Sequence, residues 1–268
     1  MNKNIFYSLG AVLIWSTLAP VAKMLLNGIP NFEVLAVCAF VAAIFLLFFN
    51  IANGSVKQIK QYKLIDYLKM SGLGFIGMFL SNALYYCGIA RMTSQEACIL
   101  NYLWPIMILI FSCIVLREKL TLMKVVAIVC SFAGIVILSL GSSSAMDEKF
   151  IVGAAAVVIN AVCYGLFSAL NKKADYNQNI AMMIFWLTTG LFAVIAGVLG
   201  NVTGLVPEPW VMLDAAQILG LVWLGIAVKA LGYLLWAIGL KKSVGQRKGR
   251  EFSVPNAVFV AHCVVLPA

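Results

Sequence analysis

Two short motifs place polar, aromatic and proline residues inside runs that are otherwise apolar. The pentapeptide NYLWP, ending at Pro105, interrupts the run ACILNYLWPIMILIFSCIVL, and WSTLAP ends at Pro20 in a similar setting. Because proline lacks an N–H, it leaves the carbonyl four residues earlier without a helical partner. The carbonyls of Asn101 and Ser16 are therefore freed, each close to a tryptophan. Such groups bind a small polar molecule without transforming it, or are satisfied by neighbouring helices.

A single lysine, Lys229, lies in the apolar run LVWLGIAVKALGYLLWAIGL. A cation in hydrocarbon is costly unless it faces water or a partner. The apolar runs are expected to hold no Asp or Glu to pair with it. Gly232, Tyr233 and Trp236 follow on the same helical face. This face predicts the lining of an aqueous cavity in which Lys229 attracts a carboxylate. The alternative is a lysine that reaches toward the interface or loses its charge.

Further polar stripes occur at helical spacing in the third and sixth apolar runs. Such stripes either line a cavity or hold helices together by hydrogen bonds, and the sequence leaves both interpretations open. The candidate cavity residues are Trp15, Ser16, Asn82, Tyr85, Asn101, Tyr102, Trp104, Asn160, Tyr164, Lys229, Tyr233 and Trp236, with Pro20 and Pro105 as helix-breaking positions.

Motifs for catalysis or metal binding are missing from the sequence. There is no Ser/His/Asp set, HExxH, P-loop or CxxC, and the seven cysteines lie in apolar stretches while the only histidine is His262. We therefore expect no enzyme activity, no cofactor and no metal. Glu96 follows Thr93 by three residues before an apolar run, which predicts a helix-capping box more than a gate.

The composition indicates the elements that position these residues. The chain of 268 residues is 63% hydrophobic and 11% charged, with a mean hydropathy of +1.00. Soluble domains are about 25% charged, and a helix of about 20 apolar residues crosses a bilayer. We predict an all-α polytopic membrane protein with eight spans and an incomplete ninth. The eight spans are 5–26, 31–52, 68–90, 95–116, 122–141, 150–170, 179–200 and 215–240.

The basic residues predict the orientation in the membrane. With the N-terminus inside, the inner side holds 15 of the 19 Lys and Arg residues. This asymmetry accounts for the net charge of +9 without a nucleic-acid partner. The expected location is the cell inner (plasma) membrane, with a cytoplasmic N-terminus.

Two pairs of segments indicate an internal repeat. LGAVLIWSTLAPVAK in the first span aligns loosely with VINAVCYGLFSALNK in the sixth, and FLSNALYYCGIARM in the third with KALGYLLWAIGLKK in the eighth. An offset of five spans inverts the second copy, and inverted repeats are typical of transporters with a site between the halves. The predicted units are a first repeat at 1–141, an incomplete second repeat at 150–242 and an aberrant tail at 243–268.

The segments VLIWSTLAPVAK, LNYLWPIMILIF, LREKLTLMKVVAIVCSFAGIVIL and LGYLLWAIGLKK together resemble the EamA family of the drug/metabolite transporter superfamily. IWST and NYLWP are most similar to its YddG-type exporters of aromatic and neutral amino acids. The resemblance implies ten helices in two inverted five-helix repeats, a central cavity lined by Trp15 and Trp104, and cytoplasmic termini. Cys163 and Lys229 depart from the pattern, which favours a smaller or more polar substrate.

The tail does not continue this pattern. A frame shift near Ser243 is one hypothesis, because a one-base shift of permissible codons for FSVPNAVFVAHCVVLPA can encode QYLTP, a partner for NYLWP. The main functional prediction is an exporter of amino acids or similar small metabolites by alternating access. The alternatives are a cationic drug efflux carrier and a non-transporting remnant or membrane interaction protein. The sequence leaves the oligomeric state and the activity of this chain open.

Overall fold

The structure, a computed structural model, describes residues 3–117, 147–204, 209–236 and 238, with 122, 125, 126, 128, 129 and 133. All regular elements within these residues are helices, which confirms the all-α prediction. Seven helical segments are long and apolar enough to cross a membrane: Leu9–Leu26, Asn31–Ala52, Leu64–Arg91, Ser94–Val115, Glu148–Lys173, Gln178–Thr203 and Ala215–Trp236. The predicted tail 243–268 and all but residues 122, 125, 126, 128, 129 and 133 of the predicted span 122–141 fall outside the described residues.

The first and fourth spans are each broken in the middle. The first span consists of α1 (Lys3–Ser16) and α2 (Leu18–Leu26), and the fourth of α6 (Ser94–Asn101) and α7 (Leu103–Val115). Each break lies three residues before a proline, where the missing N–H interrupts the helical hydrogen bonds. The motifs WSTLAP and NYLWP therefore each contain a helix break.

The third and the eighth of the predicted spans, 68–90 and 215–240, both contain a π-helical segment. The third runs through α4 (Leu64–Gly74), η2 (Phe75–Leu80) and α5 (Ser81–Arg91), and the eighth through α11 (Ala215–Trp223) and η3 (Leu224–Leu231). In the alignment of these spans, η2 falls within the counterpart of η3. Short π-helical turns inside α-helices are rare and occur often at functional sites. The paired segments support the repeat as a proposal.

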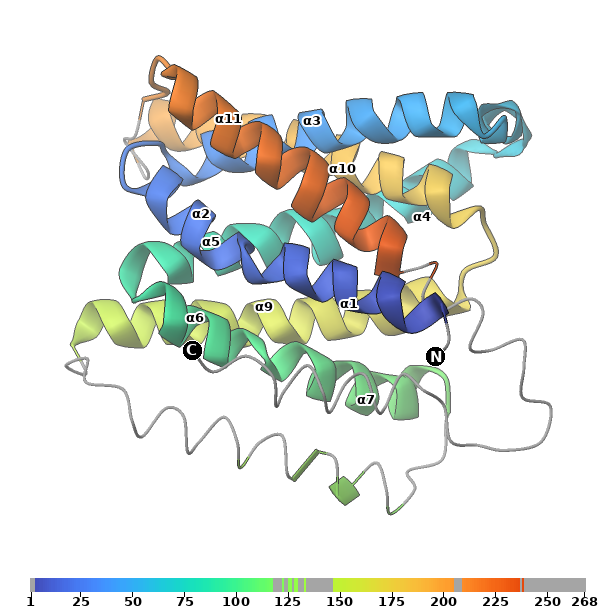
Figure 1. Cartoon of the computed structure of the whole chain (residues 1–268), viewed down its shortest axis with the longest axis horizontal. Helices are drawn as coiled ribbons and strands as arrows, with labels where there is room; N and C mark the ends of the chain where they lie inside the picture. Colours follow the sequence, from blue (N-terminus) through green and yellow to red (C-terminus); the bar gives the residue numbers. More distant parts are fainter. Residues whose placement is uncertain are drawn as a thin grey trace.

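The remaining helices complete a bundle of roughly antiparallel elements (Figure 1). They are α3 (Asn31–Ala52), η1 (Ser55–Gln61), α9 (Glu148–Lys173) and α10 (Gln178–Thr203). α3 packs along α10, while α5 and α7 pack on α9. Helices from the two ends of the described chain are thus interleaved, which brings the candidate residues of both halves together.

Close packing of α9 against α7 depends on Gly165. A Cβ atom at this position would lie 2.5 Å from Cβ of Met107 and 2.7 Å from its carbonyl carbon. Because backbone atoms cannot move aside as a flexible side chain can, only glycine allows this helix-to-helix distance. Small residues serve the same purpose in other membrane helices.

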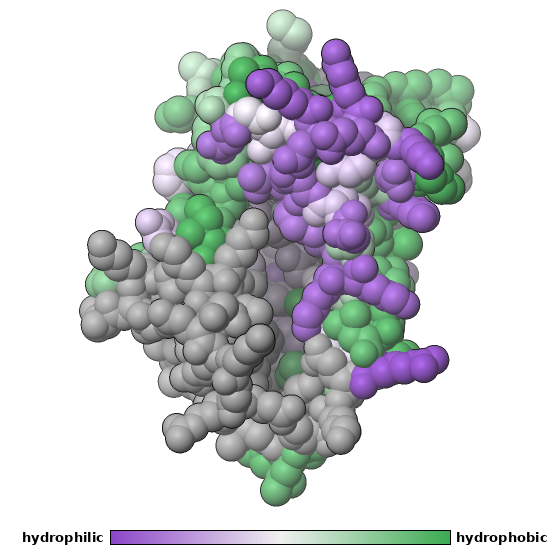
Figure 2. Space-filling model, turned by 90° about the vertical axis from the view of Figure 1, so that its right-hand side faces the viewer, coloured by the Kyte–Doolittle hydropathy of each residue, from purple (hydrophilic) through white to green (hydrophobic). Residues whose placement is uncertain are grey.

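One end of the bundle is strongly hydrophilic. The N-terminus, η1 and the C-terminal end of α9 share this end (Figure 1), and Figure 2 shows hydrophilic side chains gathered over it. Lys57 and Lys60 lie in η1, and Lys172 and Lys173 lie in the last turn of α9. These lysines are part of the basic set that predicts the cytoplasmic side.

Candidate functional site

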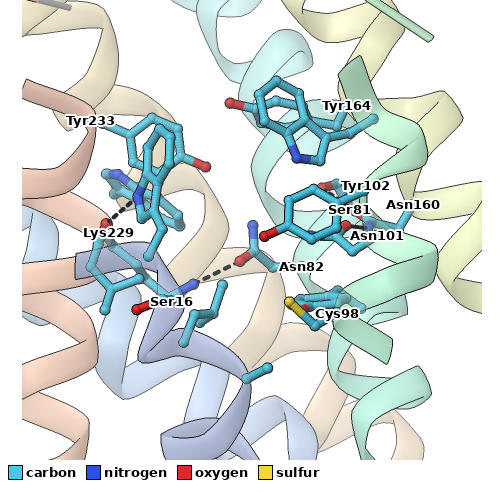
Figure 3. Close-up of a pocket in the computed structure, with 17 residues that line it drawn as sticks. Ser16, Ser81, Asn82, Cys98, Asn101, Tyr102, Asn160, Tyr164, Lys229 and Tyr233 are labelled. Carbon is cyan, nitrogen blue, oxygen red and sulfur yellow. Dashed lines mark hydrogen bonds between the residues drawn. The ribbon is translucent and has the colours of Figure 1, made fainter. Parts of the chain in front are cut away.

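A cavity lies in the middle of the bundle, between helices of both halves (Figure 3). It holds about 870 Å³ of space not filled by atoms, solvent at its mouth included. Its lining residues are Trp15, Ser16, Leu18, Ala19, Ser81, Asn82, Tyr85, Cys98, Asn101, Tyr102, Trp104, Asn160, Tyr164, Trp186, Val228, Lys229 and Tyr233. A lining of aromatic side chains with a few polar groups is typical of sites for small molecules.

Eleven of the twelve candidate residues from the sequence line this one cavity. The exception is Trp236, which does not line it but packs against the lining residue Trp15, with ring centroids 5.5 Å apart. Pro20 and Pro105 lie just beyond the helix breaks, so that the broken parts of both spans face the cavity.

Lys229 supplies the only charged side chain among the described residues that line the cavity. It belongs to η3 and is only 1% exposed. Its Nζ donates to Oδ1 of Asn82 at 2.7 Å (Figure 3). Asn82 in turn donates from Nδ2 to the carbonyl of Met78 at 2.8 Å. The ammonium also lies 4.6 Å from the ring centroid of Trp186 and 5.2 Å from that of Tyr86. Carbonyl oxygens and aromatic faces both stabilise a cation.

An amide chain forms a second polar wall. Ser81 donates from Oγ to Oδ1 of Asn160 at 2.7 Å, and Asn160 donates from Nδ2 to Oδ1 of Asn101 at 2.8 Å. Ser81 and Asn160 are buried. α5 joins both walls because Ser81 and Asn82 are adjacent (Figure 3). Three helices, α5, α9 and α6, therefore meet through one hydrogen-bonded chain at the cavity.

Aromatic side chains form the rest of the lining. Trp15 donates from Nε1 to the carbonyl of Val228 at 3.1 Å, and its ring lies 5.2 Å from that of Tyr233. Trp104 and Tyr164 form a second edge-to-face pair at 5.5 Å. These rings offer a large apolar surface with polar edges, so the cavity can hold a ligand that has both a charged and an apolar part.

The candidate set from the sequence lacked some residues of the cavity. Ser81 lies in the third apolar run, where a polar stripe is predicted, but no predicted stripe or motif includes Cys98 or Trp186. Trp186 lies in the apolar run FWLTTGLF, where neither a proline nor a charge distinguishes it from a tryptophan in contact with lipid. Its only signal is its position away from both ends of the span.

The expectation that the spans hold no acidic residue is wrong at two helix ends. Glu33 is 3% exposed in the first turn of α3, where it accepts from the backbone N–H of Val211 at 2.9 Å. Glu96 is 8% exposed at the start of α6, where it forms the predicted capping box with Thr93. Carboxylates suit these places because helix N-termini present free N–H groups. Neither side chain lines the cavity.

Comparison with known proteins gives the family. The family model of the EamA-like transporter family matches residues 2–140. An uncharacterized transporter of Archaeoglobus fulgidus is 31% identical, in an alignment that covers 76% of this chain and 72% of the transporter. The chain also superposes on a crystal structure with 22% sequence identity and a TM-score of 0.65. The superposition covers 98% of this chain and 94% of the other chain, which supports the fold.

Two relatives have named substrates. An aromatic amino acid exporter, YddG, of Ancylobacter novellus is 24% identical and covers 87% of this chain and 77% of its own length. A UDP-N-acetylglucosamine transporter of Arabidopsis thaliana is 26% identical over 96% of this chain and 82% of its own length. The relatives share membrane transport but differ in what they carry. With its apolar helices and central cavity, the chain belongs to the EamA-like transporter family of multi-pass membrane transporters.

Proposed function

We propose that this protein exports amino acids or similar small metabolites by alternating access. The observation that supports this most strongly is the mid-membrane cavity, where the Lys229 ammonium and two aromatic pairs lie together. The likeness to the aromatic amino acid exporter of Ancylobacter novellus supports the same substrate range. The chain would lie in the inner membrane with its N-terminus in the cytoplasm.

Each part of the cavity has a role in this proposal. Lys229 binds a carboxylate, because a buried ammonium forms strong charge-assisted hydrogen bonds with carboxylate oxygens. Trp15, Trp104 and Tyr233 contact the apolar part of the substrate. The carbonyls of Ser16 and Asn101, which the prolines leave without helical partners, accept from an amino or hydroxyl group.

Transport then requires no chemistry on the substrate. The hydrogen bonds from Lys229 to Asn82 and from Ser81 to Asn160 join helices of the proposed repeats 1–141 and 150–242. If the repeats rock around the cavity, these bonds break and re-form, and the cavity opens first to one side of the membrane and then to the other. Substrate that replaces Asn82 at Lys229 would be released when the cavity turns to the opposite side.

Export from loaded vesicles tests the proposal. We expect Lys229→Ala and Trp104→Ala each to reduce substrate flux at least tenfold, because the first removes the carboxylate partner and the second an aromatic wall. Lys149→Ala and Phe48→Ala are matched controls, since both residues are exposed and outside the cavity. Flux that is unchanged in both cavity variants would contradict this assignment of the site.

A further inference from the structure

The charge balance of the cavity points to a narrower class of substrate. We propose that the preferred substrate is a small monocarboxylate with a net charge of −1 and an apolar or aromatic group, rather than a zwitterionic amino acid. This inference rests on the proposed function and specifies the substrate of the same site. Three observations support it: the charge of Lys229, the position of the acidic residues outside the cavity, and the hydrogen bonds of the lining.

The first step is the net charge of the lining. Lys229 is buried at 1% exposure, and the other described lining residues are uncharged. The two carboxylates that are buried among the described residues, Glu33 and Glu96, belong to helix N-termini and do not line the cavity. A buried charge without a counter-ion is unfavourable. A monocarboxylate would make the cavity neutral, whereas a zwitterion would leave one positive charge uncompensated.

The second step concerns acceptors for a substrate ammonium group. Three asparagine side chains line the cavity, and each of their amide oxygens already has a donor. Lys229 donates to Asn82, Ser81 donates to Asn160, and Asn160 donates to Asn101. A substrate ammonium could still reach a second lone pair of these oxygens, or the carbonyls of Ser16 and Asn101, but Lys229 would repel it. Repulsion by Lys229 therefore disfavours the amino group of a zwitterion.

The third step concerns donors for a carboxylate. An ammonium group has three N–H donors, and one hydrogen bond from Lys229 to a described residue is formed, to Asn82. Trp186 also lines the cavity, and no described group accepts a hydrogen bond from its buried indole N–H. A carboxylate has two oxygens that accept such bonds. The cavity thus offers N–H donors that a carboxylate can use.

Three ligands that share a phenylethyl group can test this charge preference. 3-Phenylpropionate, L-phenylalanine and phenethylammonium carry net charges of −1, 0 and +1 at neutral pH. Their binding to the purified full chain in detergent is measured by isothermal titration calorimetry. We expect 3-phenylpropionate to bind at least tenfold more tightly than phenylalanine, and phenethylammonium to bind most weakly. If phenylalanine binds as tightly as 3-phenylpropionate or more tightly, the inference is overturned.

Variants of Lys229 test the physical cause. Lys229→Gln should weaken 3-phenylpropionate binding at least tenfold without weakening phenethylammonium binding, while Lys229→Arg keeps the native order because it keeps the charge. The exposed Lys149→Gln is the matched control and should leave the order unchanged. A tight 3-phenylpropionate complex that persists in Lys229→Gln would overturn the role of this lysine.

The same ligands separate this inference from the proposed function. Binding in the expected order, but with no flux of any ligand in vesicles, would contradict transport and support the charge preference. Flux of phenylalanine in preference to 3-phenylpropionate would support transport and overturn the charge preference. A chain that shows a cooperative unfolding transition but binds none of the three ligands would overturn the charge preference, while flux from vesicles would still test transport.

Discussion

Hydrogen bonds between the cavity residues leave little freedom to the individual side chains. Asn160 stands at the centre, because it accepts from Ser81 and donates to Asn101. Its side chain is 4% exposed, so water is a poor substitute for either partner. A change at Asn160 therefore affects three residues on three helices. This polar chain contributes to the stability of the bundle as well as to the lining of the cavity.

Asn160→Ala should lower the free energy of unfolding by about 1–3 kcal/mol, because the Ser81 hydroxyl and the Asn101 oxygen lose their partners. Unfolding in mixed detergent micelles, followed by circular dichroism, measures the effect. The exposed Asn53→Ala is the control and should change stability much less. Equal stability of the native chain and Asn160→Ala would show that the chain of hydrogen bonds is not stabilising.

Sequence reasoning identifies polar cavity residues more readily than aromatic ones. Lys229 and Asn160 are conspicuous because hydrocarbon offers a polar group no partner, so a cavity or another helix must supply one. Trp186 is not conspicuous, because an indole ring also packs favourably against lipid. The contact between Lys229 and Asn82 joins residues 147 positions apart, and no local pattern encodes it.

Among the helices, breaks and close contacts decide how the cavity forms. The breaks before Pro20 and Pro105 could be predicted, because proline acts on its own helix. The π-helical segments η2 and η3 could not, because FIGMFL and LGIAVKAL resemble ordinary apolar helix. Both segments pack closely against helices that are distant in the sequence. A Cβ at Gly77 would overlap the Phe167 ring, and one at Gly225 would lie 2.6 Å from Val41 Cγ1.

The packing of α9 on α7 provides a test at this scale. Gly165→Ala should lower the thermal unfolding temperature markedly, because its Cβ would overlap the Met107 backbone. Gly72→Ala is the matched control, since nothing lies within 4 Å of the added Cβ. Alanine is favoured over glycine in a helix by about 1 kcal/mol, so Gly72→Ala should be neutral or stabilising. The opposite order of the two unfolding temperatures would contradict this packing.

For the whole molecule, the polar bonds of the cavity join the two halves of the chain. Trp15, Ser81 and Asn82 lie in the first half, and they bond to Val228, Asn160 and Lys229 in the second. A small molecule that enters the cavity therefore meets the interface that would rearrange during the proposed alternating access. Ligand binding and movement of the halves are coupled through the same side chains in this account.

Counterflow in proteoliposomes tests this central claim most directly. Vesicles that contain the full chain are loaded with unlabelled substrate, chosen by its binding, and diluted into a trace of labelled substrate. An alternating-access carrier should accumulate the label transiently above its equilibrium level. Each unlabelled molecule that leaves the vesicle leaves the cavity open to the outside, where it binds label and carries it in. We predict this overshoot for the native chain and its loss in Trp104→Ala. Label entry at the same rate with and without internal substrate would contradict the account.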